Sequence, residues 1–208
     1  MKKDYVITLG RQLGSGGRLI GEKLAAQLGI SFYDKELIQI ASQESGLGKE
    51  FFEQADEKKN YSVFGGLFGL RGTIADEPFS TYYLNNETLF KIQSDVIRRL
   101  AEKGSCLFVG RCADYILLGN PRCLNLFISA DMNDRVRRIA ELQKLTDEKA
   151  RDYIEKADKK RAGYYTYFSN KAWGAADTYH LCINSSVLGI DDTVALIRQF
   201  AEKRFDLK

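Results

Sequence analysis

The sequence contains few of the residues that build metal sites. It has four cysteines and one histidine among 208 residues, and no two cysteines form a C-x-x-C pair. A zinc site needs a tighter cluster of such ligands. Cys106 and Cys123 lie in apolar runs that predict buried strands, where free cysteine behaves as a small hydrophobe. These observations predict a reduced, cytoplasmic protein without a bound zinc ion.

The chain also lacks a strong charge of one sign and a long hydrophobic run. The 31 basic and 28 acidic residues leave a net charge of +3, too small an excess to indicate a protein that binds nucleic acid. No stretch approaches the length that spans a membrane. The first apolar run ends at Gly10, which is too early for a signal peptide. We therefore expect neither a nucleic-acid partner nor a membrane partner.

The sequence does contain enough apolar residues for a core, since 44% of it is hydrophobic. Short β-branched runs alternate with segments of helical spacing. The predicted strands are residues 5–9, 30–33, 105–109, 124–129 and 180–184, and the predicted helices are 18–28, 81–103, 131–143, 147–168 and 190–203. This alternation predicts a three-layer α/β/α fold with a five-stranded, mainly parallel sheet. Ligands bind such sheets beyond the carboxyl ends of the strands.

Residues 45–80 do not follow this alternation. Residues 51–59 have helical spacing, but residues 63–70 combine large apolar side chains with three glycines, which disfavours both helix and strand. One interpretation is an insert on the acceptor side that becomes ordered over a ligand or partner. The other is a loop packed against the core. We expect residues 1–208 to form a single domain that contains this segment.

A glycine-rich turn joins the first predicted strand to the first predicted helix. Gly14, Ser15, Gly16 and Gly17 allow the backbone to curl so that consecutive amides face one point. The start of a helix also favours an anion there. The turn therefore predicts a phosphate site, and the alternative is a tight turn that holds no ligand.

Residues 7–25, ITLGRQLGSGGRLIGEKLA, resemble the start of the cytidylate-kinase-like family, whose loop reads G-R-x-x-G-S-G-G. The resemblance covers most of the chain and is weakest over residues 45–80. It implies the P-loop α/β fold of the nucleoside monophosphate kinases, with a helical insert and a lid over residues 147–175. It also implies ATP and Mg²⁺ as cofactors and a small-molecule acceptor, with a nucleoside monophosphate as one candidate.

The phosphate-binding turn differs from that of orthodox cytidylate kinases at two positions that contact the nucleotide and its metal. Leu19 stands where those enzymes have a hydroxyl residue that normally contacts magnesium. Gly17 stands where those enzymes have a lysine, which reaches the β- and γ-phosphates. Either Arg11 or Arg18, which flank the glycines, can supply the missing charge. The alternative for each is a solvated charge near a helix start.

Residues at the ends of two predicted strands match acceptor-binding positions of the family. Asp34 follows residues 30–33, and Arg111 belongs to a sequence that resembles the family's Gly-Arg-Asp motif. Cys112 replaces the motif's aspartate, and Asp114 is the nearby substitute. Asp34 can also position Mg²⁺ or cap the next helix, and Arg111 can form an ion pair at a helix start.

The family's acceptor-binding arginine is missing from residues 37–40, which read LIQI. In orthodox cytidylate kinases that arginine holds the phosphate of the acceptor. We therefore expect CMP to be a poor acceptor.

The resemblance also implies an arginine-rich helix after the fourth strand, which contains Arg138, and a basic lid that contains Lys156, Lys159, Lys160 and Arg161. Arg138 and Arg161 are the candidates for neutralising the transferring phosphoryl group, although a charged helix face is often only solvated. The aromatic residues 164–168 can stack on a base or simply pack. Residues 184–186 can contact adenine or cap the last helix.

These residues favour ATP-dependent phosphoryl transfer, with four candidates for catalysis: Arg18, Asp34, Arg138 and Arg161. A second hypothesis is a nucleotide-binding regulatory protein without kinase activity, which the missing lysine supports. A third is a scaffold whose residues 63–70 bind a partner. The sequence does not specify an oligomeric state.

Overall fold

The computed structural model describes residues 4–34 and 79–207. Its contacts form two compact units, Met1–Lys35 with Leu100–Lys208, and Glu36–Arg99. The described part of the second unit is most of α5 (Phe79–Lys103). Three segments discussed in the sequence lie outside the described residues: 51–59, 63–70, and 37–40, where the family's arginine is missing.

The first unit is built on a parallel sheet with the strand order β2-β3-β1-β4-β5. The strands are β1 (Val6–Arg11), β2 (Ser31–Tyr33), β3 (Cys106–Val109), β4 (Cys123–Ser129) and β5 (Leu181–Asn184). β1 is central, and Val6 pairs with Cys106 on one side and with Cys123 on the other. The chain leaves β1 toward one edge of the sheet and later crosses toward the other edge. The end of β1 is therefore a switch point, where ligands of such sheets bind.

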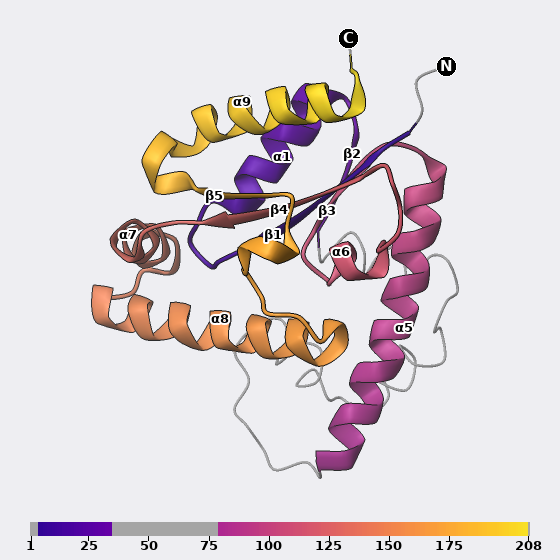
Figure 1. Cartoon of the computed structure of the whole chain (residues 1–208). Coiled ribbons are helices and arrows are strands. Elements are labelled where there is room, and N and C mark those ends of the chain that lie inside the picture. Colours follow the sequence, from indigo (N-terminus) through magenta and orange to yellow (C-terminus); the bar gives the residue numbers. More distant parts are fainter. Residues whose placement is uncertain (1–3, 35–78, 208) are drawn as a thin grey trace. The chain divides into compact units, whose positions relative to one another are not determined.

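Helices cover both faces of this sheet (Figure 1). α1 (Gly17–Leu28) and α9 (Ser185–Phe205) lie on one face, and α6 (Ala113–Ile116) and α8 (Asp147–Ser169) lie on the other. Leu24 of α1 and Ile197 of α9 share a core with Ile7 and Leu126 of the strands. Burial of these apolar side chains is the main stabilising contribution. The predicted three-layer α/β/α fold with a five-stranded parallel sheet is confirmed.

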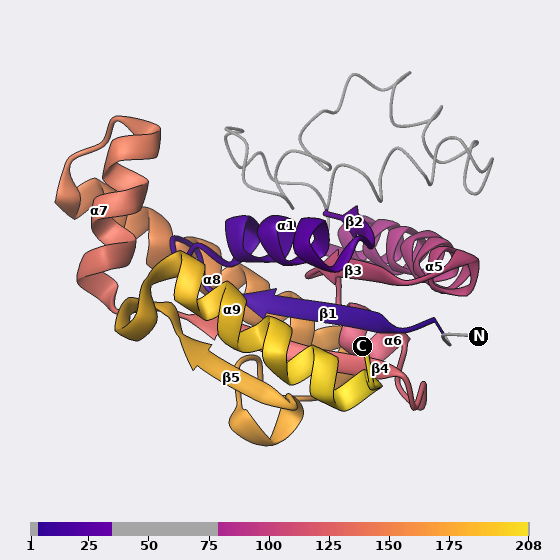
Figure 2. The same cartoon turned by 90° about the horizontal axis from the view of Figure 1, so that it is seen from above.

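α7 (Met132–Gln143) lies toward the end of the unit to which the arrowheads of β1 and β5 point (Figure 2). It packs on α8 through a smaller apolar cluster that includes Val136, Ile139 and Ile154. The residues that follow the strands are therefore enclosed by α7 and α8 as well as by the sheet.

The predicted elements are present, and their bounds differ mainly at the last helix. Gly29 ends α1 in the left-handed conformation, with φ 65°, as its position predicts. α9 begins at Ser185, five residues earlier than predicted, and Gly189 with φ 77° interrupts it. Apolar residues recur with regular helical spacing only after Gly189, so the sequence indicated only the part of α9 that follows this glycine. α6 and the 3-10 turn Ala176–Thr178 are too short to show a periodic pattern.

Replacing Leu126 by alanine should destabilise the fold strongly, because this central-strand side chain is fully buried. We expect the free energy of unfolding to fall by about 2–5 kcal/mol in urea titrations. Leu142→Ala is the matched control, since Leu142 is 73% exposed, and should change it by less than about 0.5 kcal/mol. Equal losses for the two variants would contradict the described core.

Candidate functional site

The turn between β1 and α1 requires glycine at two positions for reasons of backbone geometry. Gly14 and Gly16 have φ values of 78° and 76°, in the left-handed region. A Cβ atom at Gly14 would lie 2.8 Å from the carbonyl oxygen of Arg135, and one at Gly16 would lie 2.3 Å from Cδ1 of Ile190. The neighbouring helices α7 and α9 therefore approach the turn closely.

Polar side chains hold the turn in place mainly through its carbonyl groups. Ser15 is fully buried, and its hydroxyl donates to the carbonyl oxygen of Gln12 at 2.8 Å. The hydroxyl of Ser185 donates to the carbonyl oxygen of Ser15 at 2.7 Å. The side-chain oxygen of Gln12 accepts from the amide of Ala130 at 3.3 Å, which ties the turn to the end of β4.

Two amides of the turn remain available. Within residues 4–34 and 79–207, the amides of Gly14 and Gly16 donate no hydrogen bond, while the Gly17 amide donates to the Ser15 hydroxyl at 3.3 Å. Unpaired amides at the start of a helix attract an anion. The Ser15 amide donates to the carbonyl oxygen of Gln12 at 3.4 Å. Of the four consecutive amides considered in the sequence, those of Gly14 and Gly16 are therefore the candidate donors to an anion.

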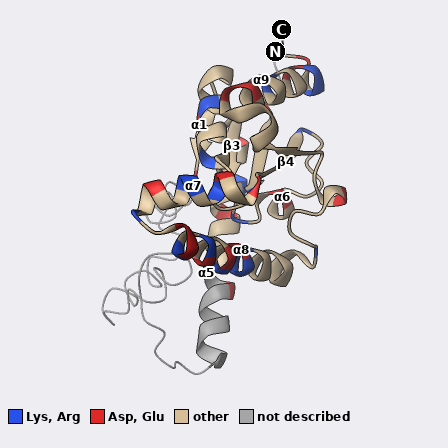
Figure 3. Ribbon diagram, turned by 90° about the vertical axis from the view of Figure 1, so that its left-hand side faces the viewer, with Lys and Arg blue, Asp and Glu red and all other residues tan. Residues whose placement is uncertain are grey.

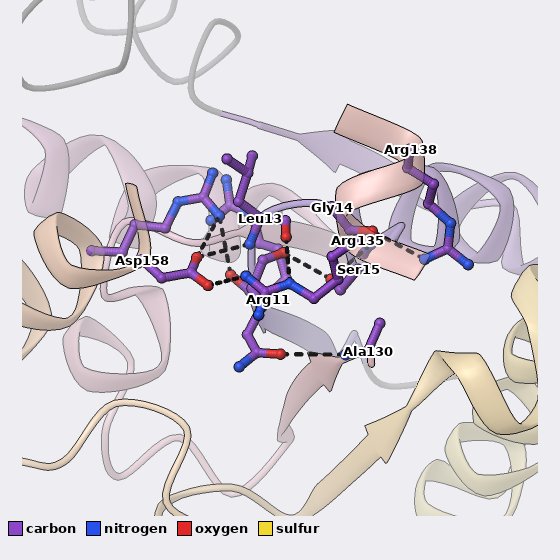
Figure 4. A network of polar contacts seen from close by, with 11 residues as sticks. Arg11, Leu13, Gly14, Ser15, Ala130, Arg135, Arg138 and Asp158 are labelled. Atoms are coloured by element: carbon purple, nitrogen blue, oxygen red, sulfur yellow. Dashed lines mark hydrogen bonds and ion pairs between the residues drawn. The ribbon is translucent and has the colours of Figure 1, made fainter. Parts of the chain in front are cut away.

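Asp158 of α8 connects the turn to α7 (Figure 4). Its Oδ1 accepts from the amide of Leu13 at 2.8 Å, and its Oδ2 pairs with Nη2 of Arg135. Nε of Arg135 in turn donates to the carbonyl oxygen of Leu13 at 2.7 Å. The side chains of Arg135 and Asp158 are only 5% and 15% exposed. Neither residue was singled out in the sequence, yet they hold α7, α8 and the turn together.

Arg138, a predicted catalytic residue, also contacts the turn. Its Nη1 donates to the carbonyl oxygen of Gly14 at 3.0 Å, from the α7 side (Figure 4). The guanidinium is therefore held beside the amides of Gly14 and Gly16.

Three further arginines form a cluster near the end of β1. Nη1 of Arg161 donates to the carbonyl oxygen of Arg11 at 3.3 Å. Burial, followed by the charges of Arg161 and Arg111, lowers the pKa of Arg11 to about 9. Burial also lowers the pKa of Arg111 to about 10, and it lowers that of Arg161. We call Arg11, Arg111 and Arg161 the arginine cluster; its like charges cost free energy that a bound anion would offset.

The lysines predicted for the lid differ from Arg161 in their surroundings. Lys156, Lys159 and Lys160 are exposed. Lys156 pairs with Asp152 on the surface at 2.7 Å. Figure 3 shows basic and acidic residues side by side along α8, as on a solvated helix face. In contrast, Arg161 lies 3.7 Å from Asp158, so it is the member of this basic group that reaches the turn.

Asp34 and Arg18 form an ion pair. Asp34 follows β2, and its Oδ2 accepts from Nε of Arg18 at 2.9 Å and pairs with Nη2 at 2.8 Å. The side chain of Asp34 is 6% exposed and that of Arg18 is 63% exposed. The charge of Asp34 also raises the pKa of Arg11 and Arg111. The carboxylate therefore lies close to the arginine cluster.

The backbone that carries Arg111 is strained. Gly110, Arg111 and Cys112 have φ values of 75°, 62° and 54°, three left-handed residues in sequence. This conformation costs roughly 1–3 kcal/mol for each of the two residues that are not glycine. Such strain persists where the surroundings fix the backbone, and it is concentrated at functional sites.

Asp114 lies in an aromatic environment. The hydroxyl of Tyr165 donates to its Oδ2 at 2.5 Å, and burial raises the pKa of the carboxyl group. Tyr165 stacks on Tyr179, and the ring of Tyr179 lies 5.0 Å from that of Phe127. Tyr165 is therefore packed in the interior, as one of the two interpretations of residues 164–168 predicted.

Asn184 caps α9, which was the alternative interpretation of residues 184–186. Its side-chain oxygen accepts from the amide of Ser186 at 3.0 Å, and its Nδ2 donates to Asp131 at 2.8 Å. The neighbouring Ser185 holds the turn, a role that the sequence did not indicate.

The described residues contain no group of three or more histidine, cysteine or acidic side chains that could hold a metal ion. Asp34 is the predicted carboxylate whose charge acts on both Arg11 and Arg111. None of the helices described is both long and apolar enough to cross a membrane.

Removing the Asp158 carboxylate should destabilise the protein, because Arg135 would be left buried without its charged partner. We expect Asp158→Ala to lower the free energy of unfolding by about 3–5 kcal/mol in urea titrations. The control is Asp152→Ala on the same helix, where an exposed pair with Lys156 is lost and about 0–1 kcal/mol is expected. Similar small effects for both variants would contradict the structural role of Asp158.

Comparison with solved structures supports the same architecture. An uncharacterized protein from Eubacterium ventriosum ATCC 27560 is 26% identical, with a TM-score of 0.71 over 95% of this chain and 98% of that one. The shikimate kinase from Bacteroides thetaiotaomicron is 16% identical, with a TM-score of 0.54 over 99% of this chain and 100% of that one. The shikimate kinase from Acinetobacter baumannii, in complex with shikimate, is 15% identical, with a TM-score of 0.54 over 100% and 97%. The likeness to the two kinases shows the fold alone.

The sequence matches no curated protein significantly. The model of the cytidylate kinase-like family, in contrast, matches residues 6–187. Family and fold together support a nucleotide-binding, kinase-like function, and P-loop kinases of this kind generally use ATP and Mg²⁺. Because the match extends over most of its length, the chain belongs to the cytidylate kinase-like family.

Proposed function

We propose that this protein transfers a phosphoryl group from ATP, with Mg²⁺, to a small-molecule acceptor. The observation that carries the proposal is the arginine cluster beside the amides of Gly14 and Gly16. Burial, followed by the charges of Arg161 and Arg111, lowers the pKa of Arg11 to about 9, so an anion bound beside the cluster would stabilise its charged form. The phosphates of a nucleotide are anions of the required charge, and guanidinium groups bind them with paired hydrogen bonds.

The turn is the donor side of the proposed site. The amides of Gly14 and Gly16, at the start of α1, would hold the phosphates of ATP. Arg138 would add a positive charge there, since it already contacts the carbonyl oxygen of Gly14. Arg11, Ser15, Gly17 and Arg18 complete the set of residues that we assign to the nucleotide.

The ends of β2 and β3 are the acceptor side. Arg111 would bind an anionic or polar group of the acceptor, and Asp34 would accept from a hydroxyl or hold the waters of Mg²⁺. Asp114 lies in the same β3–α6 segment and is assigned to the acceptor because of the family resemblance.

Phosphoryl transfer requires positioning and charge neutralisation more than a covalent group on the protein. Arg161, from the lid over residues 147–175, would neutralise charge on the transferring oxygens, while Arg18 and Arg138 would hold the donor in line. Mg²⁺, held through its waters by Asp34, would neutralise charge on the phosphates of ATP. The screen that tests the proposal follows ATP consumption with nucleoside monophosphates and with other small hydroxyl or phosphate compounds.

The alternative is a nucleotide-binding regulatory protein without kinase activity. Glycine at position 17, where P-loop enzymes have a catalytic lysine, favours it. Turnover distinguishes the two functions. ATP binding without consumption in any member of the acceptor screen would favour the regulatory protein.

CMP should be a poor acceptor, because the arginine that would hold its phosphate is absent from residues 37–40. Removing a phosphate from water is strongly unfavourable when no cationic partner replaces the water. The measurement is a coupled assay with CMP, dCMP and UMP at millimolar concentration. Turnover of CMP on the order of 1–100 per second would contradict this prediction and identify an ordinary cytidylate kinase.

Arg161→Ala should lower kcat by about 100-fold or more, because a positioned charge on the transferring group would be lost. The assay uses whichever acceptor gives the fastest ATP consumption in the screen. Lys156→Ala, on an exposed part of the same helix, is the control and should retain activity. An unchanged kcat in the Arg161 variant would remove this residue from the catalytic set.

A further inference from the structure

The space for a side chain at position 17 is already occupied. A Cβ atom on Gly17 would lie 2.6 Å from Cβ of Arg11 and 3.1 Å from its Cγ. In contrast to Gly14 and Gly16, Gly17 does not have a positive φ. Glycine is therefore required here because the stem of Arg11 crosses the residue, and not because of the backbone conformation.

Arg11 then passes a second glycine. Its Nη1 lies 2.2 Å from the position that a Cβ atom of Gly110 would take. The side chain thus extends from the end of β1, across Gly17, to the end of β3. A lysine side chain at position 17 would begin where the stem of Arg11 now lies.

Among residues 4–34 and 79–207, the guanidinium of Arg11 forms no ion pair. The charges of Arg161 and Arg111 lower its pKa, and those of Asp34 and Asp158, which lie near it without pairing, raise it. Arg18, the rival candidate, already engages Asp34 through two of its nitrogens. The structure therefore favours Arg11 over Arg18 as the substitute for a lysine.

We propose that Arg11 supplies from the end of β1 the cation that a lysine at position 17 would otherwise supply, and that Gly17 provides the space for it. The inference rests on the proposed function, because the anion that Arg11 would hold is a phosphate of ATP. A guanidinium offers several donors in a plane, so it would bind two phosphate oxygens where a lysine binds as a point charge.

The electrostatic part is tested by calorimetric titration of ATP with Mg²⁺. Arg11→Gln keeps the stem but removes the charge, and should weaken binding by roughly ten- to a hundredfold, as for a lost charged hydrogen bond. Arg11→Gly combined with Gly17→Lys should recover most of that affinity. Gly17→Lys alone should not reach the ATP affinity of the double variant, because the lysine side chain meets the Arg11 stem. Arg151→Gln, at an exposed position of α8, is the control and should bind as the native protein does.

The steric part is tested by thermal unfolding without any ligand. Gly17→Ala should lower the melting temperature of the native protein and lower it much less when Arg11→Gly is also present. An equal effect of Gly17→Ala in both backgrounds would overturn the inference, whether or not ATP binds.

The titrations distinguish the other failures. If Arg11→Gln binds ATP with native affinity and Arg18→Gln binds it more weakly, the inference is overturned and the charge belongs to Arg18. No ATP binding by the native protein would contradict the proposed function together with the electrostatic part, while the unfolding measurements would still decide the steric part.

Discussion

The geometry of the candidate site depends on one buried carboxylate, that of Asp158. It accepts from the Leu13 amide and pairs with Arg135, so that α7, α8 and the phosphate-binding turn are held by a single group. A buried ion pair contributes little net stability, but each partner becomes costly when the other is lost. The pair therefore fixes an arrangement more than it strengthens the fold. Arg161, one helical turn further along α8, takes its place beside Arg11 as a consequence.

This arrangement brings several arginines and two carboxylates together near the end of β1. Asp34 pairs with Arg18, and Asp158 pairs with Arg135. Arg161 lies 3.7 Å from Asp158 as well, and burial together with the charges of Arg161 and Arg111 lowers the pKa of Arg11. A protein that only needed stability would gain by replacing such groups with apolar ones. Under the proposed function, the phosphates of a nucleotide would offset the charge of these arginines, and Arg11, at the end of β1, would supply the charge of the absent lysine.

The sequence predicted most of the fold because its local signals agree with one another. Parallel strands are buried on both faces, so they appear as short apolar runs, and Gly29 ends α1 where the helical spacing stops. The candidate site was predicted only in part. Arg18 and Asp34 were both identified, but their pairing was not, and the choice between Arg11 and Arg18 stayed open. Asp158 and Arg135 were missed because they lie on different helices, 23 residues apart in the sequence. No periodic pattern marks a contact of this kind.

The central claim is that the amides of Gly14 and Gly16 bind the phosphates of a nucleotide. Amide resonances report on this directly, because a hydrogen bond to a phosphate oxygen shifts the resonance of the donating amide. We predict that titration of the ¹⁵N-labelled protein with ATP and Mg²⁺ shifts the Gly14 and Gly16 resonances strongly, and those of exposed glycines such as Gly119 hardly at all. Unchanged Gly14 and Gly16 resonances at saturating ATP would contradict the account.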